Sequence, residues 1–306
     1  MVTTQIPRAA PGAALLVIAA AVLFGTTGTA QALGAAQADP TALGAARIVL
    51  GGAILGIVAL AARRARVPVG APGWRDWLVV TVGAVGIAAY QPSFFTGTQQ
   101  NGVAIGTVVA LGSAPAFTGL IEWIVRRRHP GGRWVVATLL ALAGVTLISG
   151  VFTGSTSTIT PLGVAGSLAA GLAYAVYAVC SKLLLDRGWS PTGAMGAQFG
   201  AAAVLMVPLV VASQPATLTT GPVLATVIWL GVATVAVAYT LYGRGLRSLP
   251  AARASTLTLV EPLTAALLGV FLLGESFAVS TAAGMLAILV AVLILSTGPG
   301  ADASPA

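Results

Sequence analysis

The sequence predicts an all-α integral membrane protein. We expect ten transmembrane helices as two inverted five-helix repeats, with the N and C termini cytoplasmic. The composition, the spacing of apolar segments and the distribution of basic residues support this prediction. Of 306 residues, 57 % are hydrophobic and 7 % are charged, whereas soluble domains carry about 25 % charged residues. A water-soluble globule is excluded because it needs more charge, and a disordered chain because it contains fewer apolar residues.

Apolar segments long enough to cross a bilayer as helices follow one another along the chain. Backbone polar groups in lipid must be satisfied internally, which favours helices. The run from Ala137 to Ile148 also lacks the alternating polarity of a barrel strand. The predicted spans are 13–34, 42–62, 76–97, 103–125, 133–152, 161–184, 191–212, 221–242, 252–273 and 278–297.

Lysine and arginine residues determine the predicted orientation. With these spans, every basic residue except Arg47 lies on the same side as the N-terminal tail. The positive-inside rule assigns that side to the cytoplasm, which predicts a multi-pass protein of the inner (cytoplasmic) membrane. The net charge of +8 therefore orients the protein. No loop is long enough to build a nucleic-acid-reading surface, so nucleic acid is not an expected partner.

The N-terminal segment allows an alternative interpretation as a signal peptide. Arg8, the apolar stretch from Ala13 to Phe24, and Ala36-Gln37-Ala38 resemble such a peptide with its cleavage site. We expect a retained first helix instead, because cleavage would remove part of the repeat described next.

The two halves of the chain resemble each other at an offset of about 150 residues. Tyr90 matches Tyr239, Phe24-Gly25 matches Tyr174-Ala175, and the segment from Leu111 matches the one from Leu259. Five is an odd number of helices, so the halves must insert in opposite directions. The expected units are residues 1–152 and 153–298, followed by a short tail, 299–306. Inverted repeats are typical of secondary transporters, which bind solutes near the midplane and alternate access by rocking one half against the other.

Three segments carry a family resemblance. They are the stretch from Thr258 through Glu261-Pro262 to Gly274-Glu275, the pair Ala46-Arg47, and the segment around Pro115. The chain resembles the EamA type of the drug/metabolite transporter (DMT) superfamily over essentially its whole length. The resemblance implies export of amino acids, organic cations, nucleosides or other metabolites, although some members import. One departure is Phe24, where the family usually has Trp.

Glu261 is an acidic residue predicted near the membrane midplane, where ionisable groups are costly and are candidates for function. Pro262 follows it and removes one backbone hydrogen bond from the helix. A carboxylate beside freed carbonyls can bind an amine or a coupling proton. The alternative is a structural carboxyl that supports a helix kink. Pro115 is the corresponding kink candidate in the first half.

Arg47 is predicted about a turn or two inside the second span. The guanidinium can clamp a substrate carboxylate because it offers a planar fork of donors. It can instead snorkel to the headgroups or pair with Asp39. Glu122 lies four residues before Arg126, and we expect an ion pair between them on one helix.

Aromatic and hydroxyl side chains of both halves are the candidate lining of a cavity for flat or cationic solutes. Ordinary helix packing is the alternative role for each of them. The candidates are Thr26, Tyr90, Gln91, Phe94, Tyr174, Tyr177, Tyr239 and Tyr242.

These features predict a secondary-active or facilitative transporter of small metabolites, foremost an exporter of amino acids or related amines. The alternatives are a lipid or polyprenyl-carrier flippase of the same fold and, less favoured, a membrane-embedded enzyme. No metal-ligand cluster or phosphate-binding loop occurs in the sequence, so neither a metal nor another cofactor is expected. The expected partners are a small-molecule solute, the lipid bilayer and protons as a candidate coupling ion. The Gly-xxx-Gly motifs favour packing within the chain, which predicts a monomer or a weak homodimer.

Overall fold

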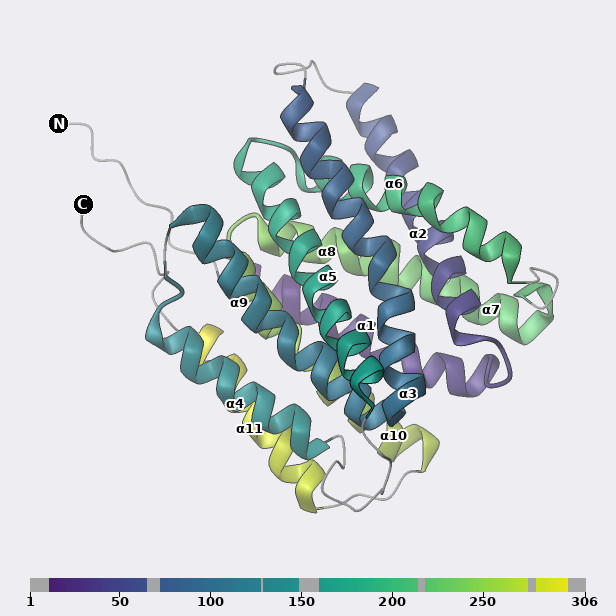
Figure 1. Ribbon diagram of the computed structural model, residues 1–306, viewed down its shortest axis with the longest axis vertical. Coiled ribbons are helices and arrows are strands. Elements are labelled where there is room, and N and C mark those ends of the chain that lie inside the picture. Colours follow the sequence, from purple (N-terminus) through teal and green to yellow (C-terminus); the bar gives the residue numbers. More distant parts are fainter. Residues whose placement is uncertain are drawn as a thin grey trace.

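A computed structural model describes residues 11–64, 72–127, 129–148, 160–213, 218–274 and 279–296. Within these ranges the regular structure is helical and contains no strand (Figure 1). The helices are α1 (Pro11–Gly34), α2 (Pro40–Arg64), α3 (Trp74–Arg126), α4 (Gly132–Ile148), α5 (Pro161–Asp186), α6 (Pro191–Ala212), α7 (Gly221–Trp229), the π-helical η2 (Leu230–Val237), α8 (Ala238–Leu246), α9 (Ala251–Leu257), α10 (Val260–Leu273) and α11 (Val279–Ser296).

Eight helical segments are long and apolar enough to cross a membrane, and two further apolar helices, Gly132–Ile148 and Val279–Leu295, are shorter. All ten coincide with predicted spans, although the ten-span topology stays a prediction. Large apolar side chains such as Leu60, Phe271 and Leu286 are exposed on the outside of the bundle. Extensive exposed apolar surface of this kind suits contact with lipid. The eight long segments are Gly12–Gly34, Pro40–Ala62, Trp74–Gly102, Ile105–Arg126, Pro161–Asp186, Pro191–Ala212, Gly221–Leu246 and Ala251–Leu273.

The long helix α3 consists of two helical arms that meet at Gly102. This residue has φ 81° and ψ 155°, a conformation that favours glycine because it has no Cβ. After the break the chain turns back, and Gly106 packs directly on the backbone of Gly97 and Thr98. The two arms correspond to the predicted spans 76–97 and 103–125. Pro115 lies inside the second arm, where the backbone remains helical.

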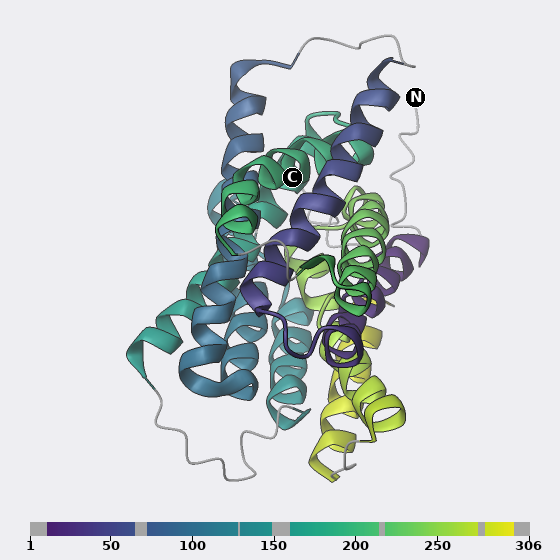
Figure 2. The same cartoon turned by 90° about the vertical axis from the view of Figure 1, so that its right-hand side faces the viewer.

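The helices pair reciprocally between the two halves. Helix α5 packs against both arms of α3, and α1 packs against both α8 and α10. Helix α2 packs on α6, and α4 lies beside α11, as Figure 1 shows. Turning the molecule shows α2 crossing the bundle obliquely (Figure 2). Two structurally related halves are expected to form such reciprocal pairs. The opposite insertion of the halves and the exact boundaries of the units stay predictions.

Glycine residues bring α2 and α6 into close contact. Gly56 faces Gly200, and a Cβ on either residue would lie 3.3–3.4 Å from the Cα of the other. A Cβ on Gly52 would collide with the carbonyl oxygen of Phe199, and one on Gly196 with Ala59. These two Gly-xxx-Gly motifs therefore pack helices within the chain, as predicted.

Candidate functional site

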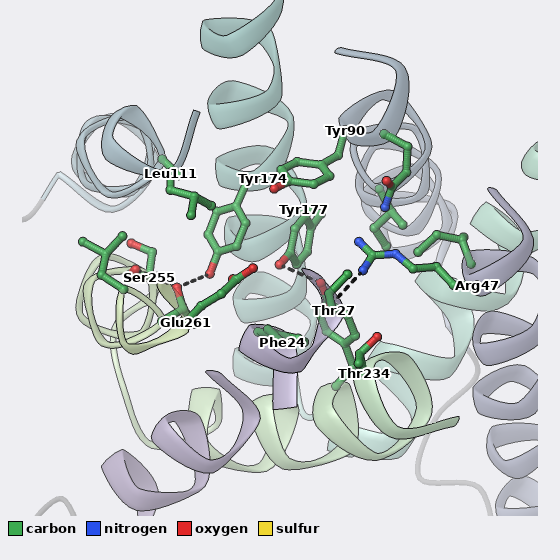
Figure 3. A pocket seen from close by; sticks show the side chains of 17 residues that line it. Phe24, Thr27, Arg47, Tyr90, Leu111, Tyr174, Tyr177, Thr234, Ser255 and Glu261 are labelled. Carbon is green, nitrogen blue, oxygen red and sulfur yellow. Dashed lines mark hydrogen bonds between the residues drawn. The ribbon is translucent and has the colours of Figure 1, made fainter. Parts of the chain in front are cut away.

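A small cavity lies between the two halves, where helices from both converge (Figure 3). Its volume is about 50 Å³, enough for a few water molecules or a small polar group. The lining combines one basic residue, one acidic residue, tyrosines and several hydroxyl groups. The lining residues are Phe24, Thr27, Arg47, Ile48, Ile87, Tyr90, Gln91, Leu111, Ala114, Tyr174, Tyr177, Thr234, Tyr239, Ser255, Thr258, Leu259 and Glu261.

Arg47 reaches the cavity from α2 and is held by neutral groups. Its Nη1 donates a hydrogen bond of 3.5 Å to the hydroxyl of Thr27. With the Gln91 amide oriented so that its oxygen faces the guanidinium, that oxygen accepts from Nε at 3.2 Å and Nη2 at 2.8 Å. Asp39 accepts a hydrogen bond from the backbone N–H of Thr41. The structure has no ion pair between Asp39 and Arg47, both of which it describes. Arg47 therefore presents a positive charge to the cavity without a carboxylate partner among the described residues.

Glu261 reaches the cavity from the first turn of α10. Proline at position 262 has no N–H, so the carbonyl of Thr258 instead accepts a bond of 2.9 Å from the backbone N–H of Glu261. The helix is interrupted there, between α9 and α10. Gly25 of α1 allows close approach, because a Cβ at that position would lie 2.6 Å from the carbonyl oxygen of Glu261. Figure 3 shows Glu261 and Arg47 entering the cavity from opposite sides, with Tyr177 between them.

Tyrosines form the wall between the two charged residues. The hydroxyl of Tyr174 is 3.0 Å from the Thr258 hydroxyl, and that of Tyr177 is 3.4 Å from the Tyr239 hydroxyl. The rings of Tyr174 and Tyr177 lie 5.0 Å apart, and Phe24 lies 4.9 Å from Tyr239. Aromatic faces of this kind attract cations, and the hydroxyls add donors and acceptors. The η2 segment contributes to the wall through its Thr234 side chain.

The cavity lining includes six of the nine predicted cavity residues and Glu261. Three predicted cavity residues lie outside it, as do the kink candidates Pro115 and Pro262. Thr26 bonds to the carbonyl of Leu23 and accepts from the indole of Trp229, because it points a different way from its neighbour Thr27. Phe94 stacks on Tyr90 with ring centroids 5.8 Å apart. Tyr242 is fully buried and packs on Tyr239 at 6.0 Å.

Several lining residues are absent from the predicted set, and two kinds of signal identify some of them. Ser255 and Thr258 precede Glu261 at intervals of three residues, which places them on its side of a helix. Phe24 is the repeat partner of Tyr174. Other lining residues, such as Leu111 and Ile87, are apolar, and no pattern separates them from ordinary core residues.

Glu122 forms the predicted ion pair with Arg126 at 3.4 Å. The structure adds a second role that the sequence did not indicate. The two carboxylate oxygens of Glu122 accept bonds of 3.1 and 2.8 Å from the backbone N–H groups of Ala251 and Ala252, at the start of α9. Glu122 therefore joins the first half of the chain to the second.

A model of the EamA-like transporter family matches residues 11–150 and again residues 161–297. The chain belongs to the EamA-like transporter family. Membership points to transport across a membrane by a multi-pass protein, and away from catalysis.

Relatives of this EamA-like protein carry transporter names. The chain is 38 % identical over 286 residues to the uncharacterized transporter YwfM of Bacillus subtilis, covering 93 % of this chain and 94 % of that one. It is 26 % identical over 215 residues to the uncharacterized inner membrane transporter YicL of Salmonella typhimurium, covering 69 % and 70 %. A protein of known crystal structure has a similar fold, with a TM-score of 0.76 and 21 % identity over 92 % of this chain and 96 % of that one.

Proposed function

We propose that this EamA-like transporter moves amino acids or related amines out of the cell across the cytoplasmic membrane. The transport is secondary-active or facilitative and proceeds by alternating access between the two halves. The observation that carries the proposal is the pair of opposite charges, Arg47 and Glu261, lining one cavity.

The chemistry of the cavity favours a zwitterion or an amine. Arg47 offers a donor fork to a carboxylate, and its partners Thr27 and Gln91 are uncharged, so its charge is available to a ligand. Glu261 offers an acceptor to an ammonium group. The tyrosines between them add cation–π attraction and hydroxyl contacts. An uncharged sugar would leave both charged groups without a partner, which costs free energy in a buried site.

The proposed topology has ten spans with both termini in the cytoplasm. In that topology the helix ends rich in arginine, here called the arginine-rich end, face the cytoplasm. They are the ends of α2, α3, α5 and α8 and the starts of α3, α4 and α9. Glu261 lies about midway along its span and is the proposed carrier of a coupling proton.

A thermal-unfolding screen of the purified protein tests the substrate class. The ligands are amino acids, amine cations, nucleosides, sugars and prenyl phosphates. A ligand at 100 times its Kd adds about 2.7 kcal/mol to the free energy of unfolding, so amino acids or amines are expected to raise Tm. Liposomes containing the protein and loaded with the hit should then release it faster than protein-free liposomes, and efflux from whole cells tests the direction. Stabilisation by prenyl phosphates alone would contradict the proposal and favour a flippase.

A further inference from the structure

Helix α9 runs from the arginine-rich end to the cavity. Its first residues, Ala251 and Ala252, lie at that end, and Ser255 lines the cavity. The helix contains seven residues, six of them buried, and most have small side chains. This short buried segment therefore lies between the cavity and the proposed cytoplasmic side.

The helix is interrupted at the cavity end of α9, between α9 and α10. Thr258 and Leu259 stand between α9 and α10, and the N–H of Leu259 bonds to the carbonyl of Thr256 at 3.1 Å in a tighter turn. Pro262 cannot donate the bond that would continue the helix. Reorientation of α9 against α10 therefore breaks fewer backbone bonds than bending a continuous helix. This interruption lies directly beside Glu261.

The other end of α9 is held by residues of the first half. Glu122 is 8 % exposed in its side chain and accepts from both N–H groups at the start of α9. A carboxylate at a helix N-terminus is favourable because the hydrogen bonds are charge-assisted and the helix dipole adds to them. Arg126 pairs with Glu122 and also with Asp186 at the end of α5. The indole of Trp134 donates 2.9 Å to the carbonyl of Ala252.

In the repeat alignment, the first half has a carboxylate at this position and the second half has none. The alignment that matches Pro115 with Pro262 places Gly269 opposite Glu122. A glycine has no side-chain acceptor with which to hold a helix N-terminus, so the two repeats differ at this point. The difference identifies Glu122 as a specific feature of the arginine-rich end.

We propose that α9 is a gate between the cavity and the cytoplasm, hinged at the interruption before Pro262 and latched closed by Glu122. The gate rests on the proposed function, because it provides one of the two access states. In this structure the latch is closed. Opening breaks the bonds from Ala251 and Ala252 to Glu122 and exposes Ser255 to the cytoplasm.

Accessibility of a single reporter cysteine tests the gate. Cys180, the one native cysteine, is replaced by Cys180→Ala, and Ser255→Cys introduces the reporter. A membrane-impermeant thiol reagent is applied to inside-out and right-side-out vesicles. We expect slow labelling from the cytoplasmic side with Glu122 present. Labelling should be about tenfold faster or more in Glu122→Gln, because the carboxamide gives up a charge-assisted bond.

A second variant changes the other partner of the latch. Ala251→Pro removes the N–H that bonds to one carboxylate oxygen, and proline suits this first helical position after Pro250. It should also speed labelling, by less than Glu122→Gln, since Ala252 still donates. The control, Asp76→Asn, weakens the ion pair with Arg187 at the same end without touching α9, and should leave labelling unchanged.

Three results would overturn the gate: unchanged labelling in both Glu122→Gln and Ala251→Pro, equal acceleration by Asp76→Asn, or rapid cytoplasmic labelling of the reporter in the parent. Gel filtration in detergent verifies that each variant is folded. The labelling needs no solute. If the latch variants open the gate while the protein moves neither amino acids nor amines, the proposed substrate is wrong and the gate stands.

Discussion

Arg47 and Glu261 determine the chemistry of the cavity because they are its charged residues. Each is approached by uncharged neighbours: Thr27 and Gln91 orient the guanidinium, and Tyr174 and Thr258 line the side near the carboxyl. Charges left without a protein partner at membrane depth are expensive and need a ligand, a proton or water.

Replacing Arg47 should remove the preference for a carboxylate. In the parent, an amino acid should bind more tightly than the amine formed by removing its carboxyl group. Arg47→Gln should weaken amino acid binding about tenfold or more, because a charge-assisted hydrogen-bonded pair is lost, and should change amine binding little. Arg47→Lys keeps the charge but loses the fork, and should fall between. Isothermal titration provides the Kd values. An equal loss for both ligands would contradict the carboxylate role.

Replacing Glu261 should separate transport from pH. Glu261→Gln keeps the size and the hydrogen-bonding shape but cannot release a proton at physiological pH. If Glu261 carries the coupling proton, a pH gradient should drive flux in liposomes containing the parent and fail to drive it in Glu261→Gln. Exchange without a gradient can persist. Unchanged flux with unchanged pH dependence in the variant would rule out the coupling role.

At the scale of elements, glycine contacts and breaks in the helices shape the cavity. Close packing of α2 on α6 holds Arg47 and the facing helices in place, and the glycine break in α3 returns its second arm alongside the first. The interruption before Pro262 lets α9 and α10 contribute different faces to one cavity. Small residues therefore govern how near the helices come to one another.

Two glycine substitutions should differ in their effect on the free energy of unfolding. Gly52→Ala places a methyl group against the carbonyl of Phe199 and should lower the free energy of unfolding by about 1–3 kcal/mol. Gly28→Ala is the matched control on α1, where an added Cβ meets nothing within 4 Å. It should be neutral or stabilising by up to about 1 kcal/mol, because alanine favours helix. Thermal unfolding in detergent measures both, and equal Tm values would contradict the packing argument.

At the scale of the whole molecule, the two halves meet through charged contacts at the arginine-rich end. Arg187 pairs with Asp76 at 2.9 Å, and Arg133 donates to the carbonyl of Ile294 at 3.0 Å. Together with the Glu122 latch, these contacts join the halves on the side proposed to be cytoplasmic. The orientation of the bundle therefore decides which access state this structure represents.

The proposed topology has a direct test. In the Cys180→Ala background, Gly73→Cys places a thiol at the start of α3, where an added Cβ has open space. Gln37→Cys places one on the exposed connection between α1 and α2, at the other end. An impermeant reagent should label Gly73→Cys in inside-out vesicles and Gln37→Cys in right-side-out vesicles, because arginine-rich ends face the cytoplasm. Labelling of both from one side would contradict the arrangement of the spans.

The sequence by itself determined the membrane class, the helices and the chemistry-bearing side chains. These follow from local properties, since segment length and hydropathy decide whether a helix forms in lipid. It also indicated the two charged residues of the cavity, because ionisable groups are rare at that depth. The repeat pattern further related Phe24 to Tyr174 and Tyr90 to Tyr239, four residues that line the cavity together.

Only the tertiary structure decided which face of each helix lines the cavity. Thr27 lines it and Thr26 does not, although the two are adjacent and chemically alike. Only the structure brought Glu122 to α9, across a separation of 129 residues in the chain. The physical reason is that helix rotation and long-range contacts depend on how all the helices pack together, which the periodicity of one segment cannot specify.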